Sequence, residues 1–252
     1  MAEPPDRTEA RLRAAAREHG PGRPATVATR LELGYLLLDR GRPAEAAAEL
    51  ADLPELLDDV GLAFAVRCDV ALLELDRTGS TRALGRVYEA AGEELGRRHP
   101  VTLRARAVCS LAMGDGEAVR QVLAEDGSLA DVRLRYARLL HELGRRVPAE
   151  RECLRLIDTL PDDAPDALRA RALLAASAHD HGQLAAVVRA QVVLRGPDHP
   201  EVAESRLLLG LVLLGLDLPG EHELRAALDI RTRRLGPTHA ATLEIARFLP
   251  DG

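Results

Sequence analysis

Along this chain, predicted helix-starting turns recur every 27 to 40 residues, and in most cases an arginine lies six residues after the turn. The predicted turns are at Pro24, Gly61, Pro100, Gly127, Pro165, Pro200 and Ala240. Six residues beyond the first six turns lie Arg30, Arg67, Arg106, Arg133, Arg171 and Arg206. The seventh turn misses by one position, with Ala246 in register and Arg247 beside it. Self-similarity at this period predicts stacked repeats, each of which buries its apolar face only against its neighbours.

Each repeat is predicted to be a pair of helices. In the fourth repeat, apolar residues at helical spacing predict a first helix over 128–143, a break at Gly144 and a second helix over 147–160. In the fifth repeat, the first helix is predicted over 165–181, followed by a break at Gly182 and a second helix that ends at Leu194. The whole chain, 1–252, is therefore predicted to be one all-α solenoid of about six units, which start near residues 24, 61, 100, 127, 165 and 200. Half-units over 6–19 and 240–249 are predicted to cap its ends.

Two repeats carry local irregularities. The third is short, and its second helix is predicted to cover only 117–124. In the sixth, Gly210 lies in the middle of a predicted helix, where we expect a partner helix to approach closely.

The composition suits close-packed helices. Hydrophobic residues make up 46% of the chain, but aromatic residues only 2%, and tryptophan is absent. A core of Leu, Ala and Val favours helices over a sheet rich in aromatic and β-branched residues. The net charge of −6 argues against a nucleic-acid surface, which needs a basic footprint.

The cysteines and the N-terminal segment predict a cytoplasmic protein. Cys68, Cys109 and Cys153 show no CxxC spacing and fall in apolar helical stretches, which predicts reduced, buried thiols. The first twenty residues lack the apolar region of a signal peptide. No apolar run approaches the roughly 18 residues that a membrane helix needs.

Several residues match tetratricopeptide repeats, whose hairpins carry small residues where the two helices cross. These residues are Ala137, Ala149, Leu156 and Pro161 in the fourth repeat, Gly34, Ala46 and Leu53 in the first, and Ala71, Ala83 and Ala90 in the second. The linkers 195–200 (RGPDHP) and 235–239 (LGPTH) resemble the LGPDHP linker of kinesin light chain-type repeats, which are common in actinobacterial proteins; 96–100 (GRRHP) is a weaker version. The resemblance implies a right-handed superhelix and a bacterial protein–protein interaction role.

The chain departs from that family on the first helix of each hairpin. Family members often carry asparagine there, pointing into the groove. The equivalent positions are Glu32, Asp69, Val108, Arg135, Leu173 and Leu208. The family's peptide-backbone contacts therefore do not transfer directly.

The recurring histidines and arginines each have two interpretations. His99, His199 and His239 recur before first helices, which favours turn capping over a metal site, because a metal needs convergent ligands. The recurring arginines either pair with carboxylates near the junctions between neighbouring hairpins or present their guanidinium groups to an acidic ligand. The structural role is favoured, since ligand sites rarely repeat so evenly.

The exposed side of the first helices is predicted to form a concave groove that binds a partner. It would have apolar ends and a charged, mostly basic middle, suited to a helix or extended segment with acidic residues between apolar anchors. The predicted partner-binding residues are Tyr35, Leu72, Arg104, Asp131, Arg135, Arg138, His141, Arg169, His179 and Leu211. The alternative is that the apolar ends pack on a second copy or on the cap helices.

The sequence favours a non-catalytic adaptor that holds a protein or peptide. No GxSxG setting, glycine-rich phosphate loop or HExxH motif occurs, so neither a catalytic residue nor a metal or other cofactor is predicted. Two alternatives remain open: a peptide- or ligand-sensing module that acts on a separate effector, and an accessory protein of a biosynthetic pathway.

Overall fold

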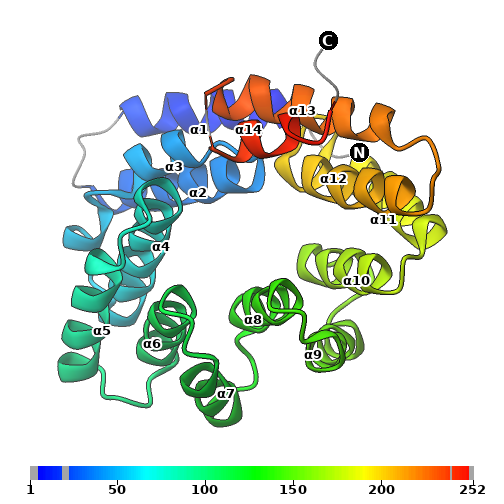
Figure 1. Cartoon of the computed structure of the whole chain (residues 1–252). Helices are drawn as coiled ribbons and strands as arrows, with labels where there is room; N and C mark the ends of the chain where they lie inside the picture. The colour runs from blue at the N-terminus through cyan, green and yellow to red at the C-terminus, as the bar shows by residue number, and fades with distance from the viewer. Residues whose placement is uncertain (1–4, 19–22, 239, 250–252) are drawn as a thin grey trace. The chain divides into compact units, whose positions relative to one another are not determined.

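The computed structural model describes residues 5–18, 23–238 and 240–249, and every regular element in these ranges is helical (Figure 1). Within this part of the chain the helices pack in consecutive hairpins, as in a helical repeat protein. His19 of the predicted half-unit 6–19 and the turn residue His239 lie outside the described ranges.

The chain forms two compact units, Met1–Gly127 and Ser128–Gly252, which are called here the N-terminal and C-terminal units. The N-terminal unit contains α1 (Pro5–Glu18), α2 (Pro24–Asp39), α3 (Pro43–Leu50), the short 3-10 helix η1 (Leu53–Glu55), α4 (Val60–Thr78), α5 (Arg82–Glu94), α6 (Pro100–Ala112) and α7 (Gly116–Glu125). The C-terminal unit contains α8 (Ala130–Glu142), α9 (Arg146–Thr159), α10 (Pro165–Ser177), α11 (His181–Arg195), α12 (Pro200–Gly215), α13 (Glu221–Leu235) and α14 (Ala240–Ala246). The division falls at the fourth predicted turn, and one continuous domain over 1–252 stays a prediction.

The first helix of each hairpin is called its A helix and the second its B helix. The A helices are α2, α4, α6, α8, α10 and α12, and the B helices are α3, α5, α7, α9, α11 and α13. Four of the A helices begin with proline, whose missing N–H costs nothing at a helix start. The hairpin turn needs one residue in the left-handed conformation, and glycine provides it at Gly41, Gly79, Gly114 and Gly144.

The fifth hairpin differs from its prediction at this turn. The A helix α10 ends at Ser177, and His179, with φ of 56°, takes the left-handed position that glycine holds in the first four hairpins; Asp217, with φ of 57°, takes it in the sixth. The break predicted at Gly182 is wrong, because Gly182 lies inside α11. The start of α11 is set by Asp180, whose side chain accepts a hydrogen bond from the Gln183 N–H at 2.9 Å.

Small residues allow the two helices of a hairpin to approach closely. A Cβ atom on Gly34 would lie 2.5 Å from the Leu50 side chain, and one on Gly210 would lie 2.7 Å from Leu224. The predicted close approach at Gly210 is therefore confirmed. Ala137, Ala149 and Leu156 of the fourth repeat are all buried, as their repeat positions require.

The second and third repeats depart from the repeat pattern in register and in helix length. In α5 the buried residues are Leu84, Val87 and Ala91, so the predicted packing positions Ala83 and Ala90 are out of register by one. Leucine at position 84 replaces the small residue of the pattern and takes the inward position. The short B helix of the third repeat is confirmed, since α7 has ten residues against fourteen in α9.

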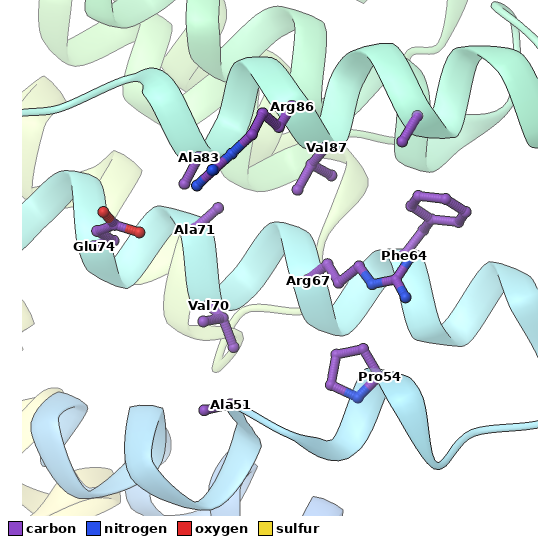
Figure 2. Close-up of a pocket in the computed structure, with 11 residues that line it drawn as sticks. Ala51, Pro54, Phe64, Arg67, Val70, Ala71, Glu74, Ala83, Arg86 and Val87 are labelled. Atoms are coloured by element: carbon purple, nitrogen blue, oxygen red, sulfur yellow. The ribbon is translucent and has the colours of Figure 1, made fainter.

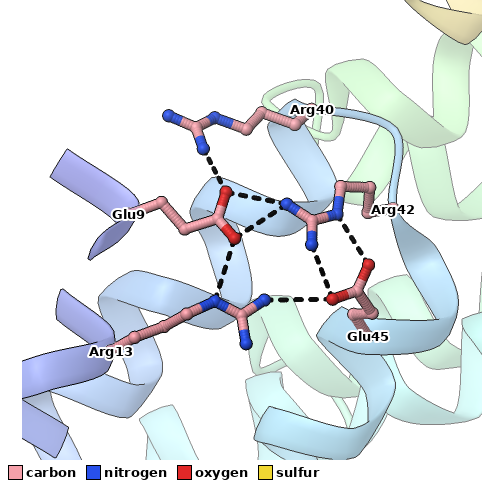
Figure 3. A network of polar contacts seen from close by, with 5 residues as sticks. All are labelled: Glu9, Arg13, Arg40, Arg42 and Glu45. Carbon is pink, nitrogen blue, oxygen red and sulfur yellow. Dashed lines mark hydrogen bonds and ion pairs between the residues drawn. The ribbon is translucent and has the colours of Figure 1, made fainter. Parts of the chain in front are cut away.

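The first helix, α1, is attached to the α2–α3 hairpin by an ionic network (Figure 3). Arg42 donates to both carboxylate oxygens of Glu9 at 2.8 and 2.7 Å and to Glu45 at 2.6 Å. Arg13 bridges the same two carboxylates at 2.9 and 3.0 Å, and Arg40 donates to Glu9. A small apolar cluster of Leu12, Leu33, Leu37 and Ala46, with Leu36 and Leu38 packed against it, adds to this attachment.

Candidate interaction surface

Most of the arginines that recur along the sequence act within their own hairpin. Arg133 on α8 pairs with Glu152 on α9, and both side chains are about nine-tenths buried. Arg106 and Arg206 likewise reach the B helix of their own hairpin. The acidic partners are Glu49 and Asp52 for Arg30, Glu55 for Arg67, Glu125 for Arg106, Glu152 for Arg133, Asp162 for Arg171, and Glu223 for Arg206.

These contacts support the structural interpretation of the arginines and correct its location. Four of the six bind the B helix of their own hairpin or the residues just after it, and only Arg67 and Arg171 reach back to the segment that precedes their A helix. An arginine and a glutamate 19 residues apart recur at 30/49, 106/125 and 133/152. That offset is visible in the sequence and would have identified the partners.

The predicted capping histidines behave as expected where the structure describes them. The His99 Nδ1 atom accepts a hydrogen bond from the Val101 N–H at 3.4 Å, and His199 Nδ1 accepts from the Glu201 N–H at 3.2 Å. Turn capping is thus confirmed for these two residues. His239 lies outside the described residues.

In the N-terminal unit, polar side chains link three successive A helices on one face. The Tyr35 hydroxyl on α2 donates to Asp69 Oδ2 on α4 at 2.9 Å. Arg104 on α6 donates to the other oxygen of the same carboxylate at 2.6 Å. Burial, reinforced by the negative charge of Asp69, raises the pKa of the Tyr35 phenol above its ordinary value, so Tyr35 remains a hydrogen-bond donor. Asp69, which occupies the family's asparagine position, is the centre of this contact.

The apolar residues expected on this face are mostly buried. Leu72 is only 5% exposed, so the prediction that it lines an exposed groove is wrong. The physical reason is that α4 packs against η1, α3, α5 and α6, which leaves a narrower exposed stripe than one helix read alone suggests. Tyr35 remains 38% exposed.

In the C-terminal unit, the A-helix face carries three more cross-links. Arg138 on α8 contacts Glu204 on α12 at 2.5 Å, and Arg169 on α10 contacts Glu201 on α12 at 2.7 Å. His141 Nδ1 and the Ser177 hydroxyl, on α8 and α10, are 2.9 Å apart.

The remaining predicted residues fall at different places in this unit. Asp131 is half-buried in the first turn of α8, and Arg135 is exposed one turn further on. Leu211 is half-buried on α12 and packs against the apolar core of the unit. His179 is exposed, but it lies in the turn after α10 and not on the helix itself, which corrects its assignment to the A-helix stripe.

The basic middle predicted for the groove is neutralised by carboxylates. Arg104, Arg138 and Arg169 each pair with an acidic residue on another A helix. The predicted groove residues include these arginines but not their acidic partners Asp69, Glu201 and Glu204. Contacts between neighbouring A helices join residues 32 to 36 positions apart, close to one repeat, and this spacing was the available signal. The contact of Arg138 with Glu204 spans about two repeats and lacks that signal.

Glu201 is the most buried acid on this face. Two arginines flank it, with Arg169 at 2.7 Å and Arg195 at 3.9 Å. Its second oxygen and the Arg169 Nε atom are buried and make no hydrogen bond. Two guanidinium groups offset the cost of burying the carboxylate.

No disulfide joins the three cysteines among the described residues; Cys68 and Cys153 are buried, as predicted, and Cys109 is half-buried. Burial, with nearby glutamates, raises the pKa of the Cys153 thiol to about 12, which disfavours its reactive thiolate. The described residues contain no group of three His, Cys, Asp or Glu side chains arranged for a metal ion. None of the helices described is both long and apolar enough to span a bilayer.

Comparison with known proteins identifies the fold. No protein-family model matches the chain, and no curated protein does. A solved structure of a tetratricopeptide repeat protein from Parabacteroides merdae superposes with a TM-score of 0.51 and 19% identity, over 95% of this chain and 90% of that one. The chain therefore has the fold of a tetratricopeptide repeat protein.

Proposed function

We propose that this protein is a non-catalytic scaffold that holds a protein or peptide segment against the face formed by its A helices. The observation that carries the proposal is the set of polar side chains from successive A helices that meet on one face, α2, α4 and α6 in one unit and α8, α10 and α12 in the other. Stacked hairpins leave such a face open along the repeat, and extended binding surfaces are how repeat proteins act. The proposed setting is the bacterial cytoplasm.

The linkers support placing these repeats among the kinesin light chain type. Gly96, Gly196 and Gly236 hold the same place in the three similar linkers, and all have φ near 90°. His99 and His199 then cap the helix that follows. The same local geometry therefore accompanies the same sequence motif.

The partner that fits the C-terminal unit is a segment with acidic residues between apolar anchors. Arg138 pairs with Glu204, yet its side chain stays 54% exposed, so it can still donate to a partner's carboxylate. Arg135 is exposed on the same helix, one turn away. Leu214 is exposed on α12 and offers an apolar contact to such a segment. The alternative is that a second copy of this chain binds through these apolar residues.

The test is to screen an array of peptides for binding to the full chain. In each peptide, acidic residues alternate with leucines. A hit is titrated against the double variant Arg138→Glu/Arg169→Glu. The control is Arg151→Glu/Arg189→Glu, which makes the same charge change at exposed positions on the B helices α9 and α11. We expect the first variant to weaken binding at least tenfold, about 1.4 kcal/mol, and the control to leave it unchanged. Equal effects of the two variants would reject the A-helix face as the binding site.

A further inference from the structure

A cavity of about 290 Å³ opens in the N-terminal unit, among α3, η1, α4 and α5 (Figure 2). Its lining is rich in small and apolar side chains, and its lining residues are Ala51, Pro54, Phe64, Arg67, Val70, Ala71, Glu74, Ala83, Arg86, Val87 and Ala90. The volume lies near the lower end of the roughly 300–1,000 Å³ range of small-molecule sites. It therefore suits a compact ligand.

The cavity follows from two sequence features. The B helix α3 has only eight residues and gives way to η1, so less side-chain bulk covers α4 on this side. Across the gap, α5 presents Ala83 and Ala90, while Leu84 and Ala91 take the buried positions. The one-residue change of register in α5 thus turns two alanines toward the space.

The two arginines that line the cavity differ in their partners, and basic residues outnumber acidic ones in the lining. Arg67 is engaged, because it donates to Glu55 at 2.9 Å and its guanidinium carbon lies 4.9 Å from the Phe64 ring centre. Arg86 reaches from α5 toward Ala71 and has no ion-pair or hydrogen-bond partner among the described residues (Figure 2). Glu74 is the single acid in the lining, against two arginines.

We propose that this cavity binds a small amphiphilic acid, with its apolar body against Val70, Ala71 and Val87 and its carboxylate on Arg86. Burial of the apolar body supplies the affinity, and a charge-assisted hydrogen bond to the guanidinium group selects the anion. Arg67, which contacts Glu55 and Phe64, adds a second positive charge to the lining of the cavity.

This site is separate from the proposed partner-binding face. Asp69, at the centre of the A-helix contact, lies roughly 140–160° around α4 from Ala71 and Glu74, at about 100° per residue. Loss of ligand binding in the cavity would leave the proposed scaffold function untouched, and the reverse also holds. A bound acid would give the protein the ligand-sensing capacity that is one of the alternatives from its sequence.

The experiment is isothermal titration of the full chain with 4-phenylbutyrate, 4-phenylbutanol and 4-phenylbutylamine, which share one apolar body and differ in charge. We expect saturable binding of the acid with one site per chain, and at least tenfold weaker binding of the alcohol and the amine. Arg86→Gln should weaken binding of the acid at least tenfold, and Ala83→Leu, which fills the cavity, should abolish it. Arg82→Gln, an exposed arginine one turn away on α5 that does not line the cavity, is the matched control.

Three results would overturn the proposal. They are the absence of saturable binding of the acid to the unmodified chain, binding of the amine as tight as that of the acid, and an equal effect of Arg82→Gln and Arg86→Gln. Far-UV circular dichroism of each variant establishes whether it remains folded. Because Arg86→Gln alters an exposed side chain, we expect this variant to fold, so a loss of its binding reports on the site and not on folding.

Discussion

At the scale of single residues, the clearest departure from an optimised core is Gln191 on α11. Its side chain is fully buried, and neither its amide oxygen nor its amide nitrogen has a hydrogen-bond partner. A buried amide without partners costs free energy that an apolar side chain of similar shape does not.

Gln191→Met should therefore stabilise the protein. We expect the free energy of unfolding to rise by about 1–2 kcal/mol, because methionine keeps the length of the side chain without the amide. Urea denaturation followed by circular dichroism measures it. The matched control is Gln183→Met, exposed in the first turn of the same helix, which should change stability by less than about 0.5 kcal/mol. A loss of stability at position 191 would show that the amide has partners after all.

Residue-level prediction from the sequence succeeded where one residue and its neighbours in the chain decide the outcome. The histidine caps are of this kind. It failed at Leu72, since burial there depends on four surrounding elements that no local pattern encodes. The predicted binding site was incomplete for the same reason. Each arginine can be recognised from the sequence, but its pairing with Glu201 or Glu204 depends on how the hairpins stack.

At the scale of helices, the recurring arginine links the two helices of a hairpin in most repeats, and the most buried of these pairs is Arg133 with Glu152. Both side chains are buried, and Arg155 also donates to Glu152 at 2.8 Å. Removing one member of a buried pair leaves the other charge poorly compensated.

Arg133→Leu should lower the free energy of unfolding by about 2–4 kcal/mol, with most of the loss restored in Arg133→Leu/Glu152→Leu. The comparison is Arg106→Leu at the same repeat position, whose pair with Glu125 is about one-third exposed and should contribute less than about 1 kcal/mol. Thermal and urea unfolding measure both. Equal costs at the two positions would mean that burial of the pair does not decide its contribution.

The attachment of α1 should depend on pH. Burial acts to raise the pKa of Glu9, but hydrogen bonds from Arg42 and Arg13 outweigh it and hold the pKa below the ordinary value. The pKa of Glu45 is lowered too, first by its hydrogen bond from Arg42. A carboxylate with a lowered pKa in the folded state stabilises that state above its unfolded-state pKa of about 4.3, and this stabilisation is lost as pH falls through the folded-state value.

Glu9→Gln should therefore cost about 1–2 kcal/mol at pH 7 and almost nothing near pH 2. Urea denaturation of the variant and the unmodified chain at both pH values measures the difference. Glu32→Gln, an exposed glutamate on α2 without an ion pair in the described part of the chain, should cost little at either pH. A constant cost for Glu9→Gln at both pH values would argue against the ionic network.

At the scale of the whole chain, the period of the sequence predicted the fold well. The hairpins, their order and most of their boundaries follow from turns, caps and apolar spacing, which are local signals. The chain's division into two compact units was not predicted, because it depends on how strongly successive hairpins contact one another and not on where they begin. The cavity in the N-terminal unit escaped prediction for a related reason: it needs a short α3 and a shifted α5 together.

The central claim, that the A helices carry the binding surface, is tested most directly by photo-crosslinking. A photoreactive amino acid placed at position 135 on α8, or at position 189 on α11, is irradiated with the acidic peptide bound to the full chain, and the adducts are quantified by mass spectrometry. Both positions are exposed, so both variants should fold. The scaffold proposal predicts abundant adducts from position 135 and few from position 189. Adducts mainly from position 189 would contradict it.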